Sequence, residues 1–518
     1  MTNHDKIEVG GLLIALVIAG TGFAALLWCT TPYSLGLSPD SISYLSTANS
    51  IMEGSGSYLF NGEPYCQWPP LLPLVICIVH ALGFDAVAGM RVVNAAAFVL
   101  LVALAFDMLR RFVPSKLMLA LGLCTLLSST GIFQVSCYLW SENLFILLVL
   151  LFLWIASRHS SDKDCWNPFI GGTVVALSIL TRWIGVTVFL TGLTLLLTMR
   201  TSSLLKKLKR VVIFSFVALA PVTFWIIHNL SVCSSPVGSR GESSASLYEY
   251  LREFSYTVSQ WFLPADFFPL LAVPLLIVLS LAFGFGLFRR MRRIGVGRFL
   301  GESASIAPLL LFCVSYSLIL PFSSLATAAD LPNIRLLSPL YIPSVILLLV
   351  GLYELVAGSG VAKRIVRISV FLVLSCWAAF CITQSIQMTA SFHANGVGGI
   401  STRDWHSSCL IDYLRRNSLD GVTYSNAPEA LYFYLGLRAR LTPQKYLYNS
   451  PKSTAADNLD EFLQVMGSGQ TVYVIWFDSV QKQFLYKMEE LASHVELNEV
   501  VDCSDGLLYL LRQKPTER

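Results

Sequence analysis

The stretch SPDSISYLSTANSIMEGSG (residues 38–56) follows the first long apolar run of the chain and places an acidic residue, Asp40, in the first turn of an expected helix. Ser38 suits the N-cap of that helix, and Pro39 suits its first position. A carboxylate in the first turn also gains roughly 0.3–1 kcal/mol from the helix dipole. The stretch therefore fits two interpretations, a capped helix at a membrane edge or a helix that carries a catalytic carboxylate.

The composition is that of an integral membrane protein. Of the 518 residues, 55% are hydrophobic and 13% are charged, whereas soluble domains carry about 25% charged residues. The first apolar run, residues 10–29, follows a single lysine and has no evident small-residue cleavage site, so we expect a retained span and no signal peptide. The net charge of +4 is small and unevenly placed, which indicates membrane topology and no nucleic-acid partner.

Apolar segments suited to membrane spans recur along the first 390 residues. A helical span needs about 20 apolar residues, and eleven segments are candidates: 10–29, 88–109, 117–138, 141–157, 167–181, 183–199, 210–229, 267–288, 304–323, 336–357 and 365–387. Basic clusters lie between them at 110–116, 158–163, 200–210, 289–298 and 363–367. Basic loops stay in the cytoplasm, so the sequence predicts a multi-pass protein of the inner (plasma) membrane with a cytoplasmic amino end, an outer loop at 30–87 and an extracytoplasmic carboxyl end.

Two segments strain a simple count of spans. The run from Pro70 to Phe84 is short and must have both ends outside, which predicts a juxtamembrane or re-entrant helix. The run 167–199 has basic clusters at both ends, so we expect a hairpin of two short helices that turns near LTRWIG. This turn places Arg182 near the outer face, where a guanidinium avoids the cost of about 2.5 kcal/mol or more at mid-membrane.

The carboxyl-terminal part differs in pattern, and we divide the chain into a transmembrane domain (1–390) and a small extracytoplasmic α/β domain (391–518). GVTYSN, TVYVIWF and LLYLLRQ have the pattern of strands, whereas DWHSSCLIDYLRRN, APEALYFYLG and VQKQFLYKMEELAS have that of amphipathic helices. Twelve cysteines lack metal-ligand spacing, so no structural metal site is expected. A disulfide between Cys409 and Cys503 is left open.

Ionisable residues at a membrane edge are candidates for function, and on the expected topology they gather on the outer side. The candidates are Asp40, Glu63, Glu142, Arg182, His228, Arg240, Asp330 and Arg335. Each has a structural alternative: the helix dipole favours an acid at Glu142, Arg335 can extend to the interface, and Asp330 can simply pair with it. His228 and the tryptophans at 68, 183 and 261 suit an interface.

The combination of one outer acid with three arginines has a chemical use. Three guanidinium groups, at Arg182, Arg240 and Arg335, can hold a phosphate through their fixed forks of donors. A nearby carboxylate, Asp40, can take a proton from an acceptor hydroxyl as general base. The reaction class is transfer of a group from a polyprenyl phosphate to an acceptor.

The succession of motifs resembles the GT-C glycosyltransferases, specifically the bacterial relatives of protein O-mannosyltransferases and aminoarabinose transferases. The resemblance covers roughly residues 10–360 and is carried, in order, by SPDSISYLSTANSIMEGSG, QWPPLLPLVICIVHALGFD, GMRVVNAAAFVLLVALAFDMLRRF, YLWSENLFILLVLLFLW, LSILTRWIGV, WIIHNLSVCSSPVGSRG and NIRLLSPLYIP. It implies a polyprenyl-phosphate sugar as donor and a lipid, protein or polysaccharide as acceptor.

The resemblance also implies roles for single residues. Asp40 takes the place of the catalytic base, and Glu142, the second catalytic candidate, takes that of an acid at the outer start of a span. Arg182 falls where a basic residue binds the lipid phosphate, and Arg240 and Arg335 resemble donor-side arginines. His228 stands where the family pattern has arginine. Asp40 lacks an acidic neighbour, so no metal site is expected, and whether a divalent cation assists is left open.

Two other classes of protein fit part of the sequence. A transporter or flippase of a lipid-linked sugar also needs many spans and anion-binding arginines, but transporters place ionisable residues near the midplane of two related halves. Here the charges gather at one face and no repeat is evident. A receptor or scaffold would explain the outer domain but not Asp40, so an enzyme is favoured.

Overall fold

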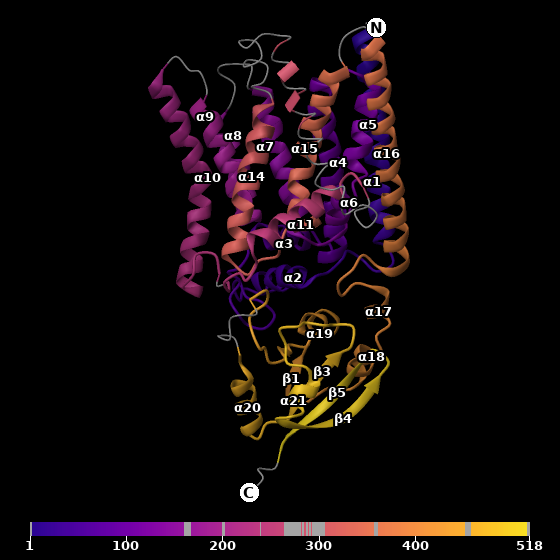
Figure 1. Cartoon of the computed structure of the whole chain (residues 1–518). Helices are drawn as coiled ribbons and strands as arrows, with labels where there is room; N and C mark the ends of the chain where they lie inside the picture. Colours follow the sequence, from indigo (N-terminus) through magenta and orange to yellow (C-terminus); the bar gives the residue numbers. More distant parts are fainter. Residues whose placement is uncertain are drawn as a thin grey trace.

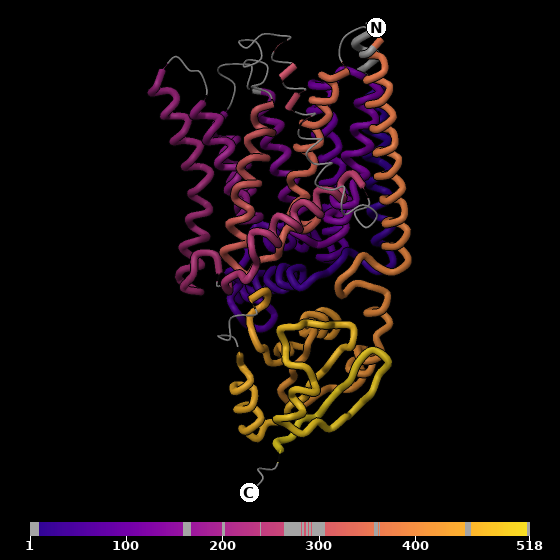
Figure 2. Tube along the Cα trace, viewed as in Figure 1, coloured from indigo at the N-terminus to yellow at the C-terminus, as the bar shows by residue number. Residues whose placement is uncertain are grey.

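The computed structural model consists of a long helical bundle joined at one end to a small sheet domain (Figure 1). It describes residues 3–159, 167–198, 203–238, 240–263, 306–356, 361–450 and 457–514, with isolated positions between 281 and 292. The amino terminus lies at the end of the bundle far from the sheet domain, and the carboxyl terminus lies beyond that domain (Figure 2). The expected fold class, a helical multi-pass protein with a carboxyl-terminal α/β unit, is confirmed.

Within the described ranges, seven helices are long and apolar enough to cross a membrane. They are α1 (Asn3–Cys29), α4 (Ala86–Phe112), α7 (Ser141–His159), α10 (Leu204–Cys233), α14 (Ala307–Ala326), α15 (Ile334–Val356) and α16 (Val361–Asn395). The pair α5 (Lys116–Leu127) and α6 (Thr130–Cys137) bends by 46° and forms an eighth span if counted as one. The expected count of eleven spans is therefore not confirmed, and the segment 267–288 lies outside the described residues except for four isolated positions.

Shorter apolar helices occupy the two segments that strained the count. The run after WPP forms α3 (Leu71–Ala81) beside α2 (Pro39–Met52). The run 167–199 forms the expected hairpin, α8 (Pro168–Thr181) and α9 (Val186–Thr198), joined by the 3-10 turn η1 (Trp183–Gly185). The turn is tight because a Cβ at Gly185 would lie 2.6 Å from the backbone oxygen of Ser178. A hairpin of two short helices thus replaces one long span.

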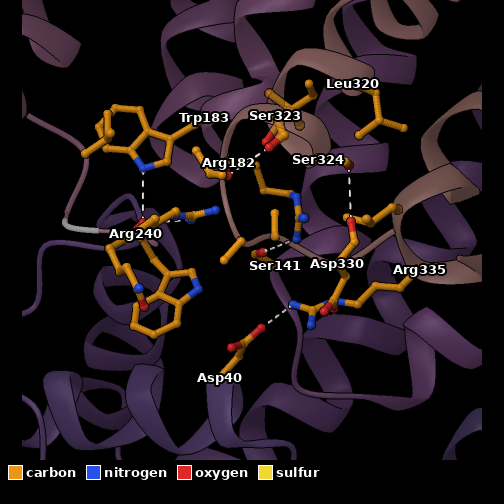
Figure 3. Close-up of a pocket in the computed structure, with 18 of the residues that line it drawn as sticks. Asp40, Ser141, Arg182, Trp183, Arg240, Leu320, Ser323, Ser324, Asp330 and Arg335 are labelled. Atoms are coloured by element: carbon orange, nitrogen blue, oxygen red, sulfur yellow. Dashed lines mark hydrogen bonds and ion pairs between the residues drawn. The ribbon is translucent and has the colours of Figure 1, made fainter. Parts of the chain in front are cut away.

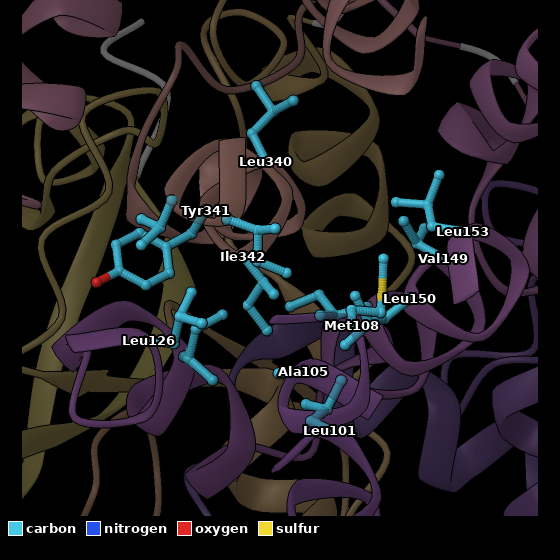
Figure 4. Packing of buried hydrophobic residues seen from close by; sticks show 14 of the residues in the cluster. Leu101, Ala105, Met108, Leu126, Val149, Leu150, Leu153, Leu340, Tyr341 and Ile342 are labelled. Carbon is cyan, nitrogen blue, oxygen red and sulfur yellow. The ribbon is translucent and has the colours of Figure 1, made fainter. Parts of the chain in front are cut away.

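The bundle is held together by close apolar packing (Figure 4). Leu101 of α4, Val149 of α7 and Ile342 of α15 are buried in one continuous core. Since lipid tails are as apolar as leucine, helix association in a membrane depends on such packing and on small residues at the contacts. Gly122 of α5 is an example, because a Cβ there would lie 2.7 Å from a methyl group of Leu349 in α15.

The carboxyl-terminal domain has a five-stranded sheet in the order β2-β1-β3-β5-β4. The strands are β1 (Val422–Ser425), β2 (Arg440–Leu441), β3 (Val472–Phe477), β4 (Val495–Cys503) and β5 (Gly506–Gln513). β1 pairs in parallel with β2 and β3, whereas β5 is antiparallel to β3 and β4. The helices are α17 (Arg403–His406), α18 (Cys409–Arg416), α19 (Pro428–Leu435), α20 (Leu459–Gly467) and α21 (Met488–Leu491).

The sequence prediction of this domain is partly wrong. The three expected strands are present, but β2, β4 and α20 were not expected. The segment expected to form a long helix from Val480 contains only the four residues of α21. Its first part is extended instead, because the backbone N–H of Lys445 donates to Phe484 O and the backbone N–H of Tyr486 donates to Pro443 O. The first expected helix is split into α17 and α18 by a turn at Ser407.

The two parts share an apolar core. Leu37 and Leu45 near α2 belong to the same buried cluster as Leu410 of α18 and Leu431 of α19. The chain after α16 also pairs with the segment before α2, since Ile400 donates its backbone N–H to Leu37 O at 2.8 Å. The domain boundary placed at 390/391 stays a prediction; α16 itself continues to Asn395.

Candidate active site

A cavity of about 440 Å³ lies where the helical bundle meets the carboxyl-terminal domain. Its charged lining consists of Asp40, Arg182, Arg240, Asp330 and Arg335. These residues come from α2, the α8–α9 hairpin, the segment between α10 and α11 (Leu247–Ser259), the α14–α15 connection and the first turn of α15. Figure 3 shows Arg240 across the cavity from Arg182 and Arg335, with Asp40 facing the cavity from α2.

The carboxylate of Asp40 takes no part in the N-cap of α2. The N-cap is Ser38, whose backbone N–H donates to Ser41 Oγ at 3.0 Å and whose hydroxyl accepts from Trp140 Nε1 at 2.8 Å. The Asp40 carboxylate instead accepts from an Nη atom of Arg335 at 2.6 Å. The neighbouring serines form the cap, so the acid is left to face the cavity.

Glu142, in the first turn of α7, does not line the cavity itself but contacts two arginines that do. Its side chain is 1% exposed and forms ion pairs with Arg182 and with Nε of Arg335. A buried carboxylate between two guanidinium groups is stabilised by both and fixes both. Arg335 therefore links Glu142 to Asp40, and its guanidinium also lies 4.6 Å above the Trp140 ring.

Arg182 occupies the point where α8 ends and η1 begins. Its backbone is extended, which breaks the helix and turns the side chain away from the helix axis. One Nη donates to Ser141 Oγ at 3.0 Å in addition to the pair with Glu142. The hairpin geometry that the basic clusters required thus delivers this arginine to the cavity.

Arg240 is held by the first outer loop. The backbone oxygen of Gln67 accepts from Arg240 at 3.4 Å and from Trp183 Nε1 at 3.2 Å. The preceding residue, Cys66, forms a disulfide with Cys233 at the end of α10. Desolvation by the surrounding cavity wall lowers the pKa of Arg240 from its ordinary value, but an arginine keeps its charge at neutral pH.

Asp330 is the point where the carboxyl-terminal domain reaches the cavity. Its Oδ1 accepts from the hydroxyl of Tyr448 at 2.9 Å and from Asn449 Nδ2 at 3.1 Å. Its backbone oxygen accepts from Ser324 Oγ of α14 at 3.1 Å. Asp330 therefore bonds to the carboxyl-terminal domain, whereas Arg335, its possible partner from the sequence, pairs with Asp40 and Glu142.

Two tyrosines lie next to Asp40. Tyr44 and Tyr65 are buried, and burial together with the negative charge of Asp40 raises the pKa of each above its ordinary value. Both phenols are therefore neutral in the physiological range. The Tyr65 hydroxyl donates to the backbone oxygen of Pro69 at 3.0 Å and so orders the loop that carries Gln67.

Glu63 and His228 are not among the residues that line this cavity. Glu63 is exposed in the first outer loop. His228 stacks on Trp225 and hydrogen-bonds Ser57 at 3.1 Å, which fits an interface role. Among the described residues, the acidic, cysteine or histidine side chains close enough to hold a metal ion are Cys409, Cys503 and Asp505, and the two cysteines form a disulfide.

Several cavity residues were not expected from the sequence. Gln67 acts through its backbone oxygen, which any residue type would supply. Tyr448 reaches the cavity from the carboxyl-terminal domain, so the sequence around it does not indicate the contact. Trp68 and Trp183, expected as interface anchors, line the cavity instead. The motif WPP beside Trp68 was the one available signal for a special loop at this place.

Comparison with solved structures places this geometry in a known architecture. The chain is similar to ArnT from Cupriavidus metallidurans, with 14% sequence identity over 97% of this chain and 98% of that one and a TM-score of 0.60 in the apo state. The similarity to the same protein bound to undecaprenyl phosphate has a TM-score of 0.59. The chain has the GT-C fold.

A second relative in structure is arabinofuranosyltransferase AftD from Mycobacteria. It matches at 13% identity with a TM-score of 0.52, over 96% of this chain and 40% of AftD. No protein-family model and no curated protein sequence matches the chain. The similarity therefore establishes the fold, and the site has to carry the functional inference.

Proposed function

We propose that this protein is an integral-membrane glycosyltransferase that moves a sugar from a polyprenyl-phosphate donor to an acceptor at the outer face of the membrane. One observation carries the proposal: Asp40 and three arginines, distant in sequence, line one cavity. ArnT, of the same fold, binds undecaprenyl phosphate. The acceptor is a lipid, a protein or a polysaccharide.

The arginines are suited to the lipid phosphate. Arg182 and Arg335 are fixed by Glu142, so their remaining N–H donors are oriented before the ligand arrives. Arg240 supplies a third charge from the opposite wall. Guanidinium forks bind phosphate oxygens with directional, charge-assisted hydrogen bonds, and such preorganised donors stabilise the charge that grows on a leaving phosphate.

Asp40 is suited to act as general base. In the transfer step the acceptor hydroxyl oxygen forms a bond to the anomeric carbon of the sugar and gives its proton to the Asp40 carboxylate. The bond between that carbon and the phosphate oxygen breaks, and its electron pair leaves with the polyprenyl phosphate. Glu142 contacts two of the arginines that line the cavity and is proposed to position them.

The proposed orientation follows from the charges. The carboxyl-terminal domain lies at the end of the bundle away from the amino terminus (Figure 1), and two of its residues, Leu447 and Tyr448, line the cavity. Lysines and arginines gather at the opposite end, for example at the start of α10. Because basic loops stay in the cytoplasm, we place the amino terminus inside and the cavity outside the inner membrane.

The test compares Asp40→Asn with the wild type in lipid. Each protein is incubated with a panel of polyprenyl-phosphate sugars, and released polyprenyl phosphate is followed by mass spectrometry. We expect donor-selective release that falls at least about 100-fold in the variant, the usual contribution of a general base. Glu53→Gln, at the exposed end of the same helix, is the matched control and should retain activity.

The rival function predicts another outcome. A transporter would move the lipid-linked sugar between leaflets without releasing polyprenyl phosphate from any donor. Full activity in Asp40→Asn would remove Asp40 as the base but leave the transferase standing.

A further inference from the structure

A tight turn of the carboxyl-terminal domain forms part of the cavity wall. We call residues 447–450 the Tyr448 turn; it is closed by a hydrogen bond from Ser450 N to Leu447 O at 2.9 Å. Asn449 has a φ of +55°, a left-handed conformation that asparagine tolerates better than most residues. Leu447 and Tyr448 line the same cavity as Arg335.

The turn presents two donors to one carboxylate oxygen. The Tyr448 hydroxyl and Asn449 Nδ2 both donate to Asp330 Oδ1, at 2.9 Å and 3.1 Å. Tyr448 is 55% exposed, and its partial desolvation together with the Asp330 charge raises its pKa to about 12, so its hydroxyl keeps the proton that it donates. The left-handed backbone at Asn449 brings its side-chain amide to the same Asp330 oxygen that the Tyr448 hydroxyl contacts.

The carboxylate belongs to the short connection between α14 and α15. Ala328 N donates to Gly241 O at 2.7 Å, and Thr257 Oγ1 donates to Pro332 O at 3.2 Å. These bonds tie the backbone of the connection to the outer segments of the membrane domain. The Tyr448 turn adds two hydrogen bonds to Asp330, the acidic side chain of this connection.

The connection leads directly into the first turn of α15, which carries Arg335. Arg335 lies five positions after Asp330 in the chain and bridges Asp40 and Glu142. A shift of the connection would change where α15 begins and where this guanidinium points. Displacements of about 1 Å at a positioned group are costly for binding and catalysis.

We infer that Tyr448 and Asn449 are positioning residues: through Asp330 they fix the start of α15, so that the carboxyl-terminal domain completes the phosphate-binding wall of the cavity. The inference rests on the proposed function for the identity of the ligand. The apolar contact of α19 with α2 and with the loop after it attaches the domain, for example through Tyr432 of α19 and Phe60 of that loop, whose rings lie 5.2 Å apart. The hydrogen bonds of the Tyr448 turn to Asp330 fix the position of Arg335 in the cavity.

The test uses the double variant Tyr448→Phe/Asn449→Gly in the full-length protein, because glycine keeps the left-handed backbone at position 449 without strain. Both donors to Asp330 are lost, whereas the ring at position 448 and the apolar attachment of α19 are kept. The matched control is Tyr446→Phe, which removes a hydroxyl bonded to Gln483 O at 3.2 Å, in the same segment but not at the cavity.

Two measurements are made on both variants. Hydrogen–deuterium exchange followed by mass spectrometry should show faster exchange over residues 327–337 in the double variant and unchanged exchange there in the control. The Kd for undecaprenyl phosphate should rise at least about fivefold in the double variant, since hydrogen bonds to a charged group are lost, with a Tm close to that of the control.

Each outcome decides the inference. Unchanged exchange at 327–337, or faster exchange with an unchanged Kd, overturns the positioning role. If the wild type itself does not bind undecaprenyl phosphate while exchange responds as expected, the positioning stands and the proposed function fails.

Discussion

At the scale of single residues, Glu142 matters because it is buried between two cations. Its carboxylate balances Arg182 and Arg335, whose side chains are themselves largely buried. Breaking a buried ion pair by removing one partner costs about 3–5 kcal/mol, because the remaining charge is left uncompensated. The sequence suggested this residue for its place at a helix start, but its strongest constraint is electrostatic.

We therefore expect Glu142→Gln to lower the thermal stability of the purified protein in detergent and to weaken its binding of undecaprenyl phosphate. Asp412→Asn provides the comparison, since its pair with Arg415 is exposed on both sides and such pairs contribute about 0–1 kcal/mol. Equal melting temperatures for the two variants would show that Glu142 does not hold the arginines.

At the scale of elements, the disulfide between Cys66 and Cys233 fastens the loop between α2 and α3 to the end of α10. Gln67, the next residue, accepts hydrogen bonds from Arg240 and Trp183. Asn229 of α10 adds a bond to Cys66 O at 3.2 Å. The loop is thereby fixed on the side where it supports an arginine of the cavity.

Replacing both cysteines by serine should lower the free energy of unfolding by about 2–5 kcal/mol and weaken undecaprenyl phosphate binding through Arg240. The double serine variant of Cys409 and Cys503 is the control, because that disulfide joins α18 to the end of β4, away from the cavity lining. It should lose stability but keep its affinity while the domain stays folded. An equal loss of affinity in both would contradict the local role of the first disulfide.

At the scale of the whole molecule, the bundle and the sheet domain are joined where Gly399 passes Leu37. Gly399 has a φ of +64°, and a Cβ there would lie 1.9 Å from Leu37 O. Gly469 has a similar φ of +76° but open space around it. Comparing an alanine substitution at the two positions therefore separates the free-energy cost of the left-handed backbone from that of the steric clash with Leu37.

Gly399→Ala should therefore destabilise the protein clearly more than Gly469→Ala, which bears only the left-handed backbone penalty of about 1–2 kcal/mol. We expect the first variant also to expose the contact between the domains to limited proteolysis near residue 400. Equal stability and equal cleavage of the two variants would show that the close approach at Leu37 is not needed to dock the domain.

Much of the architecture could be predicted from local pattern. Hydropathy marked the apolar segments, and the basic clusters required the hairpin at Arg182 and the short helix after WPP, both of which are present. Alternation identified β1, β3 and β5. These features depend on neighbouring residues in the chain, so the sequence alone determined them, together with the set of charged residues from which the site is built.

Tertiary structure alone decided how those charges are paired. Arg335 reaches Asp40 across 295 positions and Glu142 across 193, and Tyr448 reaches Asp330 across 118. No periodicity records such contacts, because they arise only when separate elements pack. The sequence determined a membrane bundle with acids and arginines at one end. Packing decided that Glu142 is buried between two arginines of the cavity, that Asp40 faces the cavity, and that the carboxyl-terminal domain forms one of its walls.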